Sequence, residues 1–169
     1  MTFGLSISAF TTLHVIISLI AMGTGFMVMY GLTVNRSLPG WTRLFLVSII
    51  LTSVTGFMFP GVSLGPPLIF GVISLITLAI VLHALYSAHL KGYWRWIYVA
   101  GVFLAHYLNV VVGVVQAFAK IGFLRQLAPE QSEPPFLLVQ AAMLLLFGFA
   151  LYLALRRFHP EAATGLRAA

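Results

Sequence analysis

Residues 93–120 carry most of the side chains that could do chemistry inside an otherwise apolar chain. At 100° per residue, the polar members of this stretch fall within an arc of roughly 80° on one helix face. They are Tyr98, His106, Asn109, Gln116 and Lys120. An imidazole and two amides that point the same way within lipid must face protein, water or a ligand. We therefore expect this face to look into a helix bundle.

Histidine is the side chain in this set that is best suited to hold a cofactor. Two imidazoles from neighbouring helices would clamp the iron of a haem b, with His106 paired to His14 or to His83. At 1.5 Å per residue, His106 lies on the order of 13 Å from the inner boundary of the membrane and His83 about 6 Å. Neither pair is well matched in depth. The alternative interpretation of His14 is helix packing with one hydrogen bond between helices.

A second cluster of amides is expected toward the other end of the same stretch. Gln116 and Lys120 lie there, and Gln140 lies near the start of the last apolar segment. They could form a small polar pocket for a quinone headgroup or a permeating solute. They could equally form an amide–amide bond that fixes two helices, worth about 0.6 kcal/mol.

The residue types that most enzymes need are missing from the apolar segments. The chain has no cysteine, and its acidic residues are three glutamates outside those segments: Glu130, Glu133 and Glu161. Thiolate metal sites and hydrolytic triads therefore lack their ligands or their orienting carboxylate. We predict no catalytic residue and no metal site.

Composition identifies the class of protein. Hydrophobic residues make up 61% of the 169 residues and charged residues 7%, whereas a soluble domain has about a quarter of its residues charged. The net charge of +6 comes from Lys and Arg residues placed mainly at the ends of apolar segments, which is typical of a membrane protein rather than of a nucleic-acid partner. The lipid bilayer is the expected environment.

Five apolar segments are each long enough to cross a bilayer. We place them at about 6–34, 41–59, 67–90, 94–120 and 134–155, and interpret the first as a retained helix rather than a signal peptide. The predicted fold is all-α, a single five-helix membrane domain over residues 1–158. Residues 122–133 are expected to form a polar loop, and residues 159–169 a disordered cytoplasmic tail.

The distribution of cations predicts the orientation of the domain. With the N-terminus outside, seven of the nine Lys and Arg residues fall on the inner side. The positive-inside rule therefore places the C-terminus in the cytoplasm. Trp41, Tyr93, Trp94 and Trp96 then lie at the inner boundary, as an aromatic belt would.

Four segments of the chain resemble a group of small bacterial inner-membrane proteins that has no assigned activity. They read LHVIISLIAMGTGFMVMYGL, LPGWTRLFLVSIILTSVTGFMFP, YLNVVVGVVQAF and APEQSEPPFLLVQ, and together they cover most of residues 13–140. The resemblance implies a multi-pass protein of the bacterial cytoplasmic membrane. It implies no functional residue.

Three functions follow as hypotheses. The first is a non-catalytic accessory or assembly component of a larger membrane complex. The second is a redox protein that holds one haem or contacts a quinone through His106. The third is a small channel or facilitator lined by the polar face of residues 98–120, which would need several copies because five short helices enclose little space.

Overall fold

The computed structural model describes residues 6–59 and 65–160, and this part of the chain consists of helices joined by short connections, without strands. Five helices are long and apolar enough to cross a membrane. They are α1 (Ile7–Thr33), α2 (Pro39–Phe57), α3 (Pro66–Leu82) with its π-helical continuation η1 (His83–Ser87), α4 (Trp94–Lys120) and α6 (Pro134–Arg157). The prediction of a five-helix membrane bundle is confirmed. The side of the membrane on which each terminus lies stays a prediction.

Local sequence explains where these helices begin. Proline occupies the first turn of α2, α3 and α6, where its fixed φ suits the helix and its missing N–H leaves no donor unpaired. Helix α1 begins instead with Ser6, whose hydroxyl oxygen accepts a hydrogen bond from the Ala9 N–H at 3.2 Å, an ordinary N-cap. The predicted starts of the second and third segments were therefore late by two residues and one residue.

The third predicted segment is present as a span, Leu68–Ser87. Its last turn widens at His83 into the π-helix η1, and left-handed His89 and Leu90 follow. One predicted element was wrong in part. The stretch 122–133 is not entirely a loop, since α5 (Gly122–Leu127) occupies its first half. The predicted tail is ordered at its start, where the His159 N–H donates to Asn35 Oδ1 at 2.7 Å. Residues 161–169 lie outside the described part.

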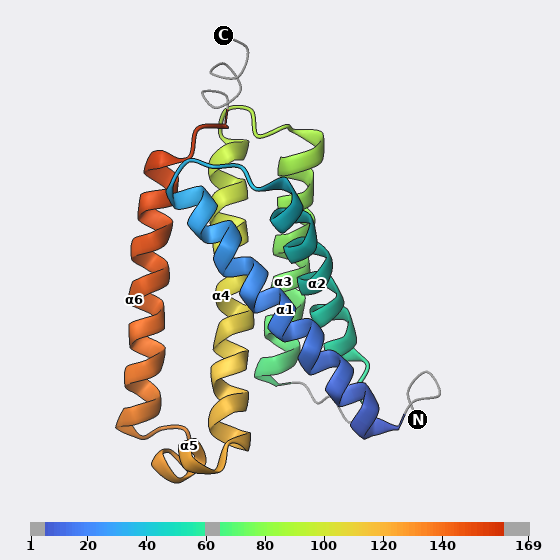
Figure 1. Ribbon diagram of the computed structural model, residues 1–169, viewed down its shortest axis with the longest axis vertical. Helices are drawn as coiled ribbons and strands as arrows, with labels where there is room; N and C mark the ends of the chain where they lie inside the picture. Colours follow the sequence, from blue (N-terminus) through green and yellow to red (C-terminus); the bar gives the residue numbers. More distant parts are fainter. Residues whose placement is uncertain (1–5, 60–64, 161–169) are drawn as a thin grey trace.

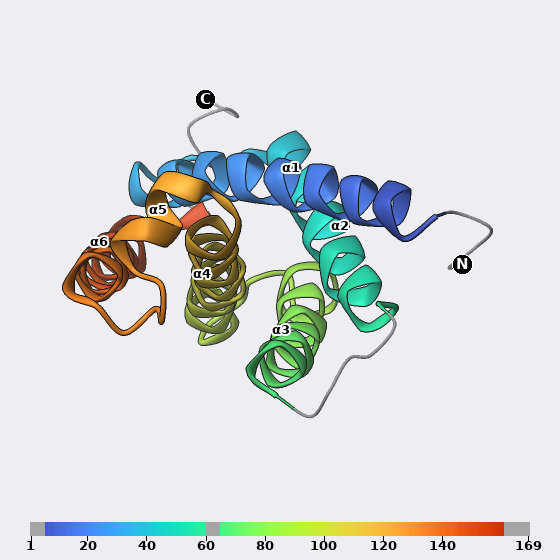
Figure 2. The ribbon, with the colours of Figure 1, turned by 90° about the horizontal axis from the view of Figure 1, so that it is seen from below.

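The helices are arranged around α4. Seen end-on, α6 and α3 flank α4 on either side, and α2 lies next to α3 (Figure 2). Helix α1 crosses this group obliquely, so that its C-terminal half lies over α4 and its N-terminal half lies along α2 (Figure 1). Because α1 crosses α4 at an angle, it covers only part of that helix. The crossing therefore decides how much of the polar face of α4 is buried.

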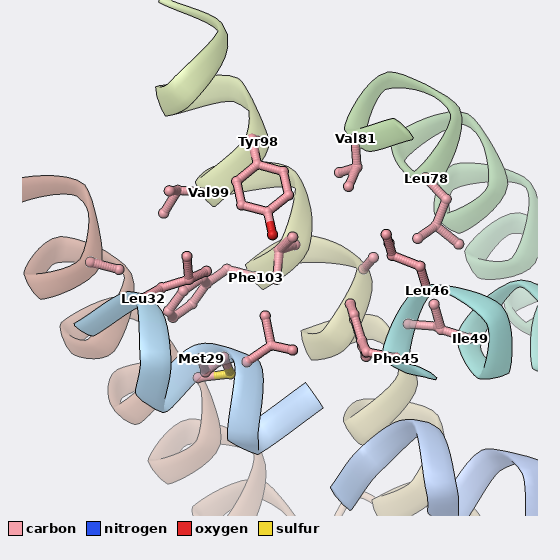
Figure 3. Close-up of a cluster of buried hydrophobic side chains, with 14 of the residues drawn as sticks. Met29, Leu32, Phe45, Leu46, Ile49, Leu78, Val81, Tyr98, Val99 and Phe103 are labelled. Carbon is pink, nitrogen blue, oxygen red and sulfur yellow. The ribbon is translucent and has the colours of Figure 1, made fainter. Parts of the chain in front are cut away.

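The core lies between α2, α3, α4 and the second half of α1 (Figure 3). Its largest enclosed apolar side chains are Phe45, Leu46, Ile49, Leu78, Val81, Val99, Val102 and Phe103. Most other large apolar residues point outward, as expected when the surroundings are lipid rather than water. One polar side chain, His106, is as deeply buried as the core residues.

Candidate functional site

The candidate site is built around His106, which lies in the middle of α4 and is 0% exposed. Its ring packs directly on Gly25 of α1, where a Cβ atom would overlap the imidazole. Three phenylalanine rings surround it, with centroids at 4.7 Å for Phe26, 5.4 Å for Phe147 and 5.7 Å for Phe45. These rings come from α1, α6 and α2, so four helices meet at one imidazole. We call this arrangement the His106 cage.

Both ring nitrogens of His106 lack a hydrogen-bond partner among the described residues, and so does the buried Asn109 Nδ2 nearby on the same helix. A buried polar atom without a partner costs about 1–3 kcal/mol and calls for an explanation such as a water molecule, a ligand or a structural role. The edges of Phe26 and Phe45 meet the imidazole nearly at right angles, a favourable aromatic geometry.

Helices α1 and α4 approach closely over two turns. Gly113 of α4 receives the Met22 side chain, just as Gly25 of α1 receives His106. Small residues allow this kind of contact between membrane helices. Met22 and Gly25 of α1 thus face α4 at these two positions.

His14 lies elsewhere, between α1 and α2. Its Nδ1 is 2.7 Å from Thr55 Oγ1, and its ring meets Phe59 edge-on at 5.2 Å. The Thr55 hydroxyl also donates its single proton in a hydrogen bond to the Leu51 carbonyl oxygen, at 2.7 Å. The network therefore assigns the imidazole proton to His14 Nδ1. The predicted interhelical bond of His14 is confirmed.

The structure does not bring the three histidines together. About 16 Å of helix separates His14 from Gly25, the residue that touches His106. His83 packs on Trp94 at a centroid distance of 4.7 Å, about 18 Å along α4 from His106. Among the described residues, no three His or Glu side chains are grouped to hold a metal ion. Neither histidine is placed to complete a haem site with His106, and the ring itself fills the space beside Gly25.

The outer half of the polar face differs from the prediction. Gln116 and Lys120 are exposed rather than turned into the bundle, because the N-terminal half of α1 diverges from α4 (Figure 1). Gln140 does not bond to Gln116. Its Oε1 is buried without a partner in the described part of the chain, while the neighbouring contact of α4 with α6 is the ring pair Phe118–Phe136 at 5.3 Å.

The N-terminal end of the face on α4 is closed by Tyr98, which is 3% exposed and lines a pocket together with Thr42 of α2. A pocket of about 190 Å³ opens beside these two residues. Sequence reasoning missed both this pocket and the phenylalanines of the His106 cage. Spacing alone could not separate Phe26, Phe45 and Phe147 from the phenylalanines that face lipid.

Comparison with known proteins adds no assignment. The chain matches no protein-family model, no curated protein and no solved structure.

Proposed function

We propose that the protein is a non-catalytic component of a larger assembly in a bacterial cytoplasmic membrane, with its N-terminus outside. The observation that carries this proposal is the use of the intramembrane polar residues for packing. His106 is enclosed by Gly25 and three phenylalanine rings, and His14 is bonded to Thr55.

The hydroxyl groups of the spans have the same role. Thr11, Thr24, Ser48 and Thr52 each donate to a backbone carbonyl within their own helix, which is the usual use of such side chains in membranes. A path for a solute along α4 would pass His106, which is fully enclosed within the protomer. A channel is therefore the least supported of the three hypotheses.

Helix α6 is the element that best fits a role in assembly. It buries three residues, Phe136, Phe147 and Ala154, on the side that faces α4 and α1. Its opposite side presents large apolar side chains, among them Leu138 at 68% and Leu145 at 72% exposed. This face accepts either lipid or a further membrane helix.

Migration of the tagged protein on a native gel tests the proposal, after mild solubilisation from cells that express it at its natural level. The expected result is a discrete band heavier than one copy. A photo-crosslinking residue at Leu145 of α6 should shift that band, whereas the same residue at Ile76, an exposed position on α3, should not. Migration as a monomer at both positions would refute an assembly role.

A second candidate function rests on the two free ring nitrogens of His106. A redox protein that contacts a haem or a quinone would use one of them as a ligand or hydrogen-bond partner. Such a group would need the ring to leave its place on Gly25, so the proposal requires a rearrangement of the His106 cage.

An absorption spectrum separates the two candidates. Protein purified in mild detergent from haem-replete cells would show a Soret band that shifts on reduction if a haem is bound. That band would have to disappear in His106→Ala, and a Tyr107→Phe variant on the same helix would serve as the matched control. A spectrum with the 280 nm band alone would eliminate haem.

A further inference from the structure

The pocket beside Tyr98 lies at the inner end of the bundle, the end that holds the α1–α2 connection, η1 and the start of α4 (Figure 1). Its volume is about 190 Å³, below the roughly 300–1,000 Å³ of sites that enclose a drug-sized ligand. It therefore admits a headgroup-sized part of a molecule rather than the whole of a large one.

The pocket is lined by both apolar and polar residues. The apolar lining includes Val28, Leu32, Leu85 and Phe158. The polar lining consists of the hydroxyl-bearing residues Ser37, Thr42, Tyr86 and Tyr98 and of two arginines, Arg36 and Arg43. An amphipathic lining of this kind suits an amphipathic occupant.

The two arginines give the pocket its charge preference. Arg36 and Arg43 are both exposed, and neither guanidinium pairs with a carboxylate or another side chain within residues 6–59 and 65–160. The chain has three acidic residues in total, and the two that are described, Glu130 and Glu133, lie in the connection between α4 and α6 at the opposite end. Arginine at such a position binds phosphate oxygens well because its planar donors match their geometry.

Part of the pocket wall is formed by backbone that departs from regular α-helical geometry. Leu85 and Tyr86 belong to η1, and Leu90 is held in the left-handed region at φ 58°. A π-turn and a left-handed leucine are both uncommon and are found more often at functional sites than elsewhere. A regular α-helix through residue 90 would place these side chains on other faces.

We propose that this pocket binds the phosphate headgroup of an anionic phospholipid. Arg36 and Arg43 would contact the phosphate, and the apolar part of the lipid would pack against the lining residues Leu32 and Leu85. Basic pockets between membrane helices bind lipid headgroups in this way. The inner position of the pocket matches the leaflet that the cation distribution assigns to the cytoplasm. The site would retain lipid whether or not the protein belongs to an assembly.

The expected affinity change follows from the number of cations. Each Lys or Arg near an anionic surface contributes a factor of about five in binding, so removal of both arginines should weaken binding by about 30-fold. The Arg36→Gln/Arg43→Gln variant should fold normally, since neither guanidinium has a side-chain partner in the described part of the chain. Its melting temperature without added lipid checks this directly.

Native mass spectrometry of the delipidated protein in detergent, titrated with phosphatidylglycerol, measures the effect. The matched control is Lys120→Gln/Arg125→Gln, which also removes two exposed cations but at the opposite end. The control should bind phosphatidylglycerol as the wild type does, and phosphatidylcholine should bind the wild type much more weakly. An Arg36→Lys/Arg43→Lys variant should keep part of the affinity.

Three outcomes would overturn the proposal. Equal loss in both double variants would mean that diffuse charge, not the pocket, attracts the lipid. Equal binding of phosphatidylcholine would remove the role of anionic charge. Full competition by millimolar inorganic phosphate would assign the pocket to a free anion instead of a lipid.

Discussion

Replacement of Gly25 by alanine is the sharpest test of the His106 cage. The added Cβ would overlap the His106 ring, and the ring cannot swing aside because it is fully buried between phenylalanines. Overpacking of this kind costs about 1–3 kcal/mol. Against this stands a gain of about 0.5–1 kcal/mol for alanine over glycine within a helix, so we expect a net loss of about 1–2 kcal/mol.

The same helix offers a matched control. Gly23 lies two residues earlier, and a Cβ added there would meet nothing within 4 Å. Gly23→Ala should therefore be neutral or slightly stabilising. For a protein of this size, 1 kcal/mol corresponds to about 2–4 °C in melting temperature. Thermal unfolding in detergent, followed by circular dichroism, should show Gly25→Ala several degrees below Gly23→Ala.

A double variant tests whether the imidazole is the cause. His106→Ala removes the ring that the new Cβ would overlap, so the cost of Gly25→Ala should fall in that background. The difference between the two backgrounds should be about 1–2 kcal/mol, within the range found for residues in contact. Equal melting temperatures for the two glycine variants, or an unchanged cost without the imidazole, would refute the packing described for α1 and α4.

Two further predictions concern other parts of the bundle. Thr55→Val should remove the bond to His14 and lower stability by about 0.6 kcal/mol, whereas Thr12→Val, whose hydroxyl bonds only to its own helix, should have little effect in the same unfolding assay. In the connection between α4 and α6, the backbone N–H groups of Glu130 and Ser132 donate to the Glu133 carboxylate and lower its pKa below the usual value of 4.5. These two hydrogen bonds should therefore stabilise the connection at neutral pH and be lost as pH falls through the lowered pKa of Glu133. The NMR chemical shift of the Ser132 amide should titrate below pH 4.5 in the wild type but not in Glu133→Gln.

Much of the architecture follows directly from one-dimensional patterns. Runs of apolar residues without charge predict membrane helices because a buried backbone must satisfy its own hydrogen bonds. The prolines at positions 39, 66 and 134 mark three helix starts, and the predicted spans agree with the structure to within a few residues. The sequence did not predict that the last turn of the third span is the π-helix η1.

The candidate site was predictable in part. Helical spacing placed Tyr98, His106 and Asn109 on one face of a helix. In the N-terminal half of α4, that face does point into the bundle. The same spacing treated Gln116 and Lys120 identically, yet both are exposed. Periodicity assigns residues to one face of a helix. It does not say how much of that face a neighbouring helix covers, because this depends on the crossing angle between the two helices.

The sequence by itself determined a bundle of five helices able to span a membrane, a polar face on residues 98–120 and the uneven distribution of cations between the ends of the spans. Tertiary structure alone decided which polar residues meet. It placed His106 against Gly25, bonded His14 to Thr55 and kept the histidines apart. It also gathered Arg36, Arg43 and Tyr98 around one pocket. The reason is physical: hydropathy and helical period act along one chain segment, whereas a site requires the tilt and register of several helices, which are set by the close packing of their side chains.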